Sequence, residues 1–224
     1  CKGAGMICPN MATMLCAVLT DAAVDAKDWQ AMLDRAVTKT FNRVSVDGDT
    51  STNDTIYALA NGAAGVPASA ADLPLIEAGL TEVLADLSYM LVQDGEGATK
   101  VLHIEVTGAE TQEDAEAVAR TVGHSPLVKT AMYGADANWG RIVAAIGRSG
   151  ADYEPDAVSV HLGNVLLFEK GEPTECDYDA VCGPILKKSD VRIVINLNAG
   201  TAAYTFLASD LTHAYVDCNA AYRS

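Results

Sequence analysis

Apolar residues recur at three- and four-residue intervals in several segments of the chain, which is the spacing of a helix that buries one face. The clearest case is residues 72–92, where leucine, isoleucine, valine and methionine side chains fall on one side. The same spacing predicts further helices over residues 25–44, 112–122, 142–148 and 178–188, with a short element over 125–130. Asp25 is a suitable N-cap for the first of these, because its carboxylate can accept a backbone N–H.

Strands are predicted where apolar and polar residues alternate, or where a short apolar run is bounded by turns. These segments are residues 14–19, 101–107, 158–162, 165–168, 191–197 and 201–207. Residues 55–60 follow a polar loop whose last part can cap a helix, so we expect a further short helix there. The sequence thus predicts a mixed α/β (α+β) fold in which layered sheets are flanked by helices.

The pattern also predicts two subdomains. A break that contains glycine and proline interrupts the helical pattern at residues 123–126. We therefore place a first part of the fold over residues 13–125 and a second α/β subdomain over residues 126–224. Residues 209–224 keep aromatic and apolar side chains to the end of the chain. A disordered tail would lack them, so we expect this tail to be held against the fold.

The balance of charge excludes one class of function. The chain has 30 acidic against 15 basic residues and a formal net charge of −15. Sequence-independent binding to nucleic acid or to an anionic membrane needs a positive face. No apolar run reaches the ~18 residues of a membrane span, and the first residues lack the pattern of a signal peptide. We expect a cytoplasmic protein with neither kind of partner, and, since the chain begins with Cys1, further sequence upstream.

The six cysteines do not form a recognisable metal or disulfide pattern. They stand at positions 1, 8, 16, 176, 182 and 218, with no Cys-x-x-Cys pair and no histidine at the spacing of a zinc site. A chain of this length with so few cysteines is not a disulfide scaffold. We expect no bound metal, and reduced cysteines that pack as small hydrophobic side chains.

Residues 45–55 form a loop that is polar at almost every position. Its short hydroxyl, amide and carboxylate side chains favour dense local hydrogen bonding. Two interpretations remain open: the loop supports a catalytic centre or binds a polar substrate, or it is an elaborate helix cap. A calcium-binding EF-hand is excluded, because no glutamate closes a twelve-residue loop that starts at Asp47.

Two glycine-rich turns are further candidates for binding. The turn at residues 94–100, Asp-Gly-Glu-Gly-Ala-Thr-Lys, lacks the spacing of a Walker A phosphate loop, and its two carboxylates suit an ammonium group better than a phosphate. It is alternatively a simple helix end and connection. The turn at residues 133–141 offers backbone N–H groups and the guanidinium of Arg141 to a carboxylate or to another domain. Structural capping explains it equally well.

The opening stretch places Thr13 directly after the turn Pro9-Asn10-Met11-Ala12 and at the start of a predicted strand. A threonine hydroxyl is a poor nucleophile unless a base stands beside it. A chain that begins with the threonine supplies that base as its own α-amine, which requires cleavage of the Ala12–Thr13 bond. The residues alone do not decide for this chemistry, since threonine is common at the start of a strand.

Residues 2–15, Lys-Gly-Ala-Gly-Met-Ile-Cys-Pro-Asn-Met-Ala-Thr-Met-Leu, resemble the self-cleavage motif of the ornithine acetyltransferase family, the bifunctional glutamate N-acetyltransferases of arginine biosynthesis. The polar loop, both glycine-rich turns and the closing Asn-Ala-Ala-Tyr-Arg-Ser match the family pattern in the same order. The resemblance therefore covers essentially the whole chain. It implies self-cleavage between Ala12 and Thr13, so that residues 1–12 are the C-terminal tail of an α chain and the remainder is the β chain. The missing part of α would complete the fold and supply the oxyanion hole.

The resemblance also implies an activity and a set of site residues. The family transfers acetyl from N-acetylornithine to glutamate by a ping-pong mechanism, and some members also accept acetyl-CoA as donor. Thr13 matches the nucleophile, and four positions match substrate-binding residues: Lys2, Glu96, Asn219 and Ser224. The last two imply that the C-terminal tail returns to the site. No metal or prosthetic group is implied, and the expected assembly is a heterotetramer of two α and two β chains.

Two other functions compete with this one. The first is an N-terminal-nucleophile amidase or aminopeptidase, which also cleaves itself but passes the acyl group to water. The second is a non-catalytic subunit that holds an amino acid with the turn at Glu96 and the tail. Cys16 lies close to Thr13 in sequence, and we interpret it as strand packing, since no histidine is near it and Thr13 carries the motif match.

Overall fold

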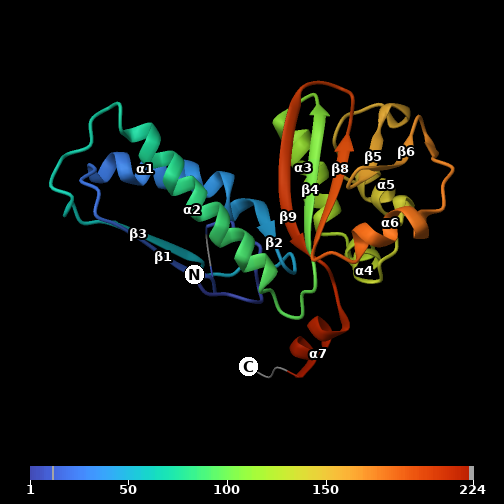
Figure 1. Cartoon of the computed structure of the whole chain (residues 1–224), viewed down its shortest axis with the longest axis horizontal. Helices are drawn as coiled ribbons and strands as arrows, with labels where there is room; N and C mark the ends of the chain where they lie inside the picture. The colour runs from blue at the N-terminus through green and yellow to red at the C-terminus, as the bar shows by residue number, and fades with distance from the viewer. Residues whose placement is uncertain (12, 222–224) are drawn as a thin grey trace. The chain divides into compact units, whose positions relative to one another are not determined.

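The computed structural model describes residues 1–11 and 13–221. The chain forms two compact units, Cys1–Gly95 and Glu96–Ser224, and each is a mixture of helices and strands (Figure 1). The predicted α/β class is confirmed. The predicted boundary after residue 125 is wrong, because the strand β4 (Val101–Ala109) pairs with two strands from the end of the chain and so belongs to the second unit.

In the first unit, β1 (Leu15–Thr20) and β3 (Thr55–Ala60) form a parallel pair, in which Leu15 lies opposite Thr55 and Thr20 opposite Ala60. The helix predicted over residues 55–60 is therefore wrong. Backbone hydrogen bonds to a strand about 40 residues earlier outweigh the local tendency of the preceding loop to start a helix, because a strand can be stabilised by a distant partner.

One α-helix lies between these two strands in sequence, and a second follows them. The carboxylate of Asp25 accepts a hydrogen bond from the N–H of Lys27 and starts α1 (Ala26–Lys39) as predicted. The helix ends earlier than predicted, and a 3₁₀ turn (Phe41–Arg43) and the short strand β2 (Val44–Ser45) follow. Helix α2 (Leu73–Gln93) packs against α1, with an ion pair of 2.6 Å between Arg35 and Glu77 at the rim of the contact.

The second unit contains a sheet with the strand order β9-β4-β8-β5-β6-β7. β4 is parallel to β8 (Asp190–Asn196) and antiparallel to β9 (Ala202–Ser209), so it lies between two strands that follow one another in sequence (Figure 1). The predicted hairpin is confirmed as β5 (Ser159–Leu162) and β6 (Val165–Glu169), which are antiparallel, and β7 (Glu172–Pro173) extends the edge.

Polar caps decide where the helices of this unit begin. A side chain accepts a backbone N–H at the start of each of α3 (Gln112–Gly123), α4 (Pro126–Tyr133), α5 (Trp139–Gly147) and α6 (Tyr178–Leu186), and the four caps are Thr111, Ser125, Asn138 and Asp177. A 3₁₀ turn (Pro155–Ala157) precedes β5. The apolar faces of these helices join the sheet in one core, which includes Ile104, Val118, Met132, Ile146 and Ile193.

The C-terminal tail is held against its unit, as predicted, through helix α7 (His213–Ala221). The hydroxyl of Thr212 accepts the N–H of Tyr215 at the start of this helix and donates to the carbonyl of Gly97 at 2.7 Å. Within the described residues, no helix has the length and apolar character needed to cross a membrane.

Candidate active site

The polar loop at residues 45–55 holds Thr13 by its backbone and its side chain. The Thr13 N–H donates to Ser51 Oγ and to Asp54 Oδ1, the latter at 2.5 Å. The Thr13 hydroxyl lies 2.9 Å from Ser51 Oγ. The next residue is held in the same way, since the N–H of Met14 donates to Asp54 Oδ1 at 2.8 Å. Thr13 itself is exposed, so its hydroxyl is accessible to a small molecule.

The same loop fixes the segment that precedes Thr13. The carboxylate of Asp47 accepts the N–H groups of Met6 and Ile7 at 2.7 and 3.1 Å. The hydroxyl of Thr50 donates to the carbonyl of Cys8 at 2.8 Å. These contacts fit the interpretation in which the loop supports a catalytic centre. The helix-cap interpretation is wrong, because the loop leads into a strand.

The backbone is strained on the upstream side of the candidate cleavage site. Met6 and Met11 have φ angles of 55° and 45°, a region that is unfavourable for residues with a Cβ atom. In the segment before Thr13, φ is also positive at Gly3, at 148°, but Met6 and Met11 are the positions where a side chain makes it unfavourable. Ala12 lies outside the described residues.

Lys2 is brought close to Thr13 by backbone pairing. The N–H of Lys2 donates to the carbonyl of Leu15 at 2.8 Å, and the N–H of Leu15 donates back at 3.0 Å. This antiparallel bridge fixes Lys2 beside the strand that follows Thr13. The Lys2 side chain is exposed, as a residue that binds a substrate carboxylate needs to be.

In the second unit, the structure brings together two other predicted site residues. The side-chain amide of Asn219 donates to Glu96 Oε2 at 3.0 Å and to the carbonyl of Tyr215 at 3.0 Å. Gly97 permits this arrangement: its φ is +64°, and a Cβ atom there would collide with the backbone of Ala214 and Tyr215. Ser224, the remaining predicted contact, lies outside the described residues.

Asp210 ties the glycine-rich turn to the end of the chain, and sequence reasoning missed it. This buried carboxylate accepts the N–H groups of Thr99 and Lys100 at 2.9 and 3.2 Å through Oδ1, and the Thr99 hydroxyl at 2.5 Å through Oδ2. Nearby, the ammonium of Lys100 donates to the carbonyl of Met132 at 2.5 Å. Burial lowers the pKa of Lys100, and the negative charge of Asp210 opposes that shift.

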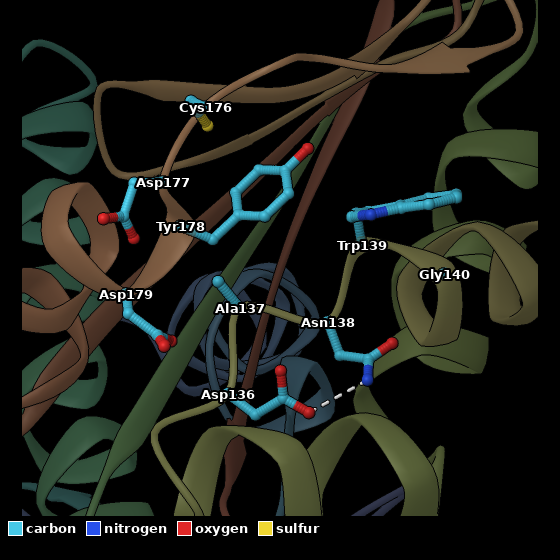
Figure 2. A pocket seen from close by; sticks show the side chains of 9 residues that line it. All are labelled: Asp136, Ala137, Asn138, Trp139, Gly140, Cys176, Asp177, Tyr178 and Asp179. Atoms are coloured by element: carbon cyan, nitrogen blue, oxygen red, sulfur yellow. Dashed lines mark hydrogen bonds between the residues drawn. The ribbon is translucent and has the colours of Figure 1, made fainter.

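The turn at residues 133–141 has a structural role in the second unit. Asn138 Oδ1 accepts the N–H of Arg141 at 3.1 Å, and its Nδ2 donates to Asp136 at 2.9 Å (Figure 2). The guanidinium of Arg141 donates to the carbonyl of Leu127 at 2.9 Å. The turn also lines a cavity of about 460 Å³ together with residues 176–179 (Figure 2). Lys2, Glu96 and Asn219, the predicted substrate-binding residues that the structure describes, do not line this cavity.

The six cysteines are all free thiols, as predicted. Three of them, Cys8, Cys16 and Cys182, are buried, whereas Cys1, Cys176 and Cys218 are exposed, so the expectation of packing is wrong for the second set. Burial raises the pKa of Cys16, which disfavours the thiolate that a cysteine nucleophile needs. Among residues 1–11 and 13–221, no three His, Cys, Asp or Glu side chains are grouped to hold a metal ion.

Comparison with known proteins identifies the family. The model of the ArgJ family matches residues 1–224. The chain belongs to the ArgJ family. Within this family it is 63% identical over 223 residues to the arginine biosynthesis bifunctional protein ArgJ of Nitratidesulfovibrio vulgaris, and 45% identical over 232 residues to ArgJ of Synechocystis sp.. The alignments cover 100% and 99% of this chain but only 57% and 56% of the relatives.

The chain thus spans about half the length of the curated relatives that it matches. The fold agrees with a crystal structure of arginine biosynthesis bifunctional protein ArgJ from Bacillus halodurans, at 39% identity and a TM-score of 0.88. That comparison covers 93% of this chain and 100% of the solved chain. The resemblance inferred from the motifs is therefore confirmed at the level of the family and the fold.

Proposed function

We propose that this chain is part of a glutamate N-acetyltransferase of arginine biosynthesis, which transfers acetyl from N-acetylornithine to glutamate with Thr13 as nucleophile. The observation that carries the proposal is the arrangement around Thr13, an exposed threonine whose nitrogen and hydroxyl are both held by Ser51, with Asp54 on the nitrogen. The names of the relatives, bifunctional proteins of arginine biosynthesis, support the pathway.

The first step of the proposed chemistry is cleavage of the Ala12–Thr13 bond. Thr13 Oγ1 attacks the carbonyl carbon of Ala12 and loses its proton, the C–N bond breaks, and that proton ends on the nitrogen, which becomes the α-amine of Thr13. Water then hydrolyses the resulting ester and regenerates the hydroxyl. The strained φ of Met11 supports this step.

The second step is acetyl transfer through an ester on Thr13. The neutral α-amine accepts the proton of Oγ1, the oxygen attacks the acetyl carbonyl of N-acetylornithine, and the proton passes to ornithine as it leaves. The amine of glutamate then attacks the acetyl ester, and N-acetylglutamate departs while the hydroxyl of Thr13 is restored. The developing oxyanion needs donors that lie outside this chain, in the remainder of the protein.

Charge complementarity assigns the substrate contacts. The ammonium of Lys2 suits the α-carboxylate that both substrates carry, and the carboxylate of Glu96 suits an ammonium group such as the side-chain amine of N-acetylornithine. Asn219, hydrogen-bonded to Glu96, orients that carboxylate. We propose Ser224 as a further contact from the tail. The reaction as written uses no metal or prosthetic group.

The competing function is an amidase that releases acetate, and a direct assay separates the two. The full-length protein is incubated with N-acetylornithine and labelled glutamate, and the products are identified by mass spectrometry. We expect labelled N-acetylglutamate and ornithine in equal amounts. Release of acetate without labelled N-acetylglutamate would contradict the transferase and favour the amidase.

We also propose where the remainder of the protein binds. The pair β1–β3 carries four large apolar side chains on one face, and all are exposed: Leu15, Leu19, Tyr57 and Leu59. The opposite face, which includes Ile56, lies toward α1. Parallel strands are normally covered on both faces. We propose that the part of the curated relatives that this chain does not match covers the exposed face, as an α chain in a cytoplasmic assembly of two α and two β chains.

A charged residue on this face is expected to weaken the assembly. Leu59 is 59% exposed here, and burial of a leucine contributes about 1.5–3 kcal/mol. Leu59→Glu should therefore reduce the amount of upstream chain that co-purifies with a tagged β chain by about tenfold or more. Leu127→Glu is the control, since Leu127 is equally exposed at 58% but lies on α4. Equal recovery from both variants would exclude the β1–β3 face as the interface.

A further inference from the structure

Acceptors outnumber donors around the nitrogen of Thr13. As an amide, this nitrogen carries one hydrogen, and it faces two acceptors, Ser51 Oγ and Asp54 Oδ1. Both acceptor residues are buried, with exposed fractions of 2% and 6%. Asp54 Oδ1 additionally accepts the N–H of Met14. Ser51 Oγ is also approached by the Thr13 hydroxyl and by the N–H of Asn53, so the spare acceptor capacity lies at Asp54.

The second carboxylate oxygen of Asp54 adds a further acceptor without a donor. Asp54 Oδ2 is buried and has no hydrogen-bond partner among the described residues. A buried carboxylate oxygen without a donor is unfavourable, and such groups in native proteins call for an explanation. Because the other oxygen of this carboxylate already contacts Thr13 N, the unfilled capacity lies at the candidate nucleophile.

The hydroxyl groups nearby do not supply the missing donor. Ser51 donates its hydrogen to Asn53 Oδ1 at 2.7 Å, so its oxygen acts as the acceptor toward Thr13. In the 2.9 Å contact between Ser51 Oγ and Thr13 Oγ1, the donor is consequently Thr13. Both hydroxyl hydrogens are thus committed, and further donors have to come from the nitrogen.

Cleavage provides those donors. When the Ala12–Thr13 bond is cut, the nitrogen changes from an amide with one N–H to an amine with two, or an ammonium with three. We propose that Asp54 is the positioning residue for the α-amine of Thr13 in the cleaved enzyme: its carboxylate binds the new N–H groups and holds the nitrogen beside Oγ1. This inference rests on the proposed function, since it concerns the base that the mechanism uses.

The pairing has a consequence for pH dependence. A carboxylate stabilises an ammonium, so Asp54 is expected to raise the pKa of the amine above the ordinary α-amino value of about 7.7–8.0. The amine accepts the Oγ1 proton only when it is neutral, so the rate rises with pH through this pKa. Removal of the carboxylate charge lowers the pKa, and the rise then occurs at lower pH.

Other titratable groups near Thr13 are placed differently. The carboxylate of Asp47 accepts hydrogen bonds from the N–H groups of Met6 and Ile7. Asp49 lies farther along the loop and is exposed. Lys2 is held beside Leu15, where its charge would lower the pKa of a nearby amine. Cys8 and Cys16 are buried, and the raised pKa of Cys16 keeps that thiol neutral. Asp54 is the carboxylate in contact with the nitrogen.

The test uses Asp54→Asn in the full-length protein, a change that removes the charge and keeps the shape. Intact-mass measurements report cleavage, and kcat for acetyl transfer is measured across pH. We expect a cleaved variant with kcat reduced about tenfold or more, in which the acidic limb of the kcat profile shifts to lower pH by about one unit. Asp49→Asn, a charge change on the exposed part of the same loop, should leave the limb in place.

The outcomes separate this inference from the proposed function. A wild-type protein that neither cleaves nor transfers acetyl overturns both. An active wild type together with an unshifted limb in Asp54→Asn overturns the role of Asp54 alone. If the variant fails to cleave, residues 13–224 are instead expressed as a fusion in cells that also produce the upstream chain. A protease then cuts the fusion so that Thr13 is the first residue of the β chain. The shift of the limb in that complex then decides in the same way.

Discussion

Replacement of Thr13 by alanine is expected to leave the full-length protein as one uncut chain with no acetyl transfer. The hydroxyl is the atom that attacks in both proposed steps, and no neighbouring group replaces it: Ser51 Oγ is buried, and Cys16 is buried with a raised pKa. Loss of a nucleophile in enzymes of this kind costs about 10⁴-fold or more in kcat. Intact-mass spectrometry and the acetyl-transfer assay measure the two effects on one preparation.

Thr13→Ser is the matched control for this substitution. It retains the hydroxyl and the hydrogen bonds to Ser51 and Asp54, so it should still cleave and retain measurable transfer. Efficient cleavage of Thr13→Ala at the same bond would refute the proposed role of Thr13. Unchanged binding function in an uncut Thr13→Ala protein would favour the non-catalytic subunit.

Gly97→Ala is expected to raise KM by about tenfold or more while cleavage at Thr13 continues. The added Cβ would collide with the backbone of Ala214 and Tyr215, at a φ of +64° that already disfavours any residue except glycine by about 1–2 kcal/mol. The collision displaces α7 and, with it, the contact of Asn219 with Glu96. Steady-state kinetics with both substrates measure the change in KM.

The control for Gly97→Ala is another glycine-to-alanine change in the same unit. Gly147 is the last residue of α5, and a Cβ built there meets no described atom within 4 Å apart from its chain neighbours and the backbone of its own helix. Gly147→Ala should therefore leave KM unchanged and not destabilise the fold. If Gly97→Ala has the KM of the wild type, the turn at Glu96 and α7 do not form a substrate contact.

The sequence predicted most elements of the fold because their apolar spacing is local. The long helix α2 and the central strand β4 need no information from elsewhere in the chain. Two predictions failed for a common reason. Residues 55–60 form a strand through pairing with β1, and β4 joins the second unit through β8 and β9. Both outcomes depend on partners distant in sequence, which a local pattern does not contain.

The residues of the candidate site likewise divide into those that the sequence indicated and those that only distant contacts reveal. The local pattern made Thr13 a possible nucleophile without deciding for it, and resemblance to a family selected Thr13 together with Lys2, Glu96 and Asn219. Three carboxylate or hydroxyl groups that hold Thr13 or the glycine-rich turn after Glu96 were not singled out: Ser51, Asp54 and Asp210. Serine and aspartate are common in polar loops and at strand ends, so nothing in the sequence distinguished these three. Their roles arise from contacts with residues 38 to 111 positions away, which only the folded chain reveals.

The central claim is that Thr13 becomes the first residue of a chain and carries the acetyl group. Its most direct test is the intact mass of the purified full-length protein after brief exposure to N-acetylornithine without glutamate. We expect two chains, the second beginning at Thr13 and heavier by one acetyl group, and we expect that added mass to disappear when glutamate is added. A single uncut chain that transfers acetyl, or an acetyl group on any residue other than Thr13, would contradict this claim.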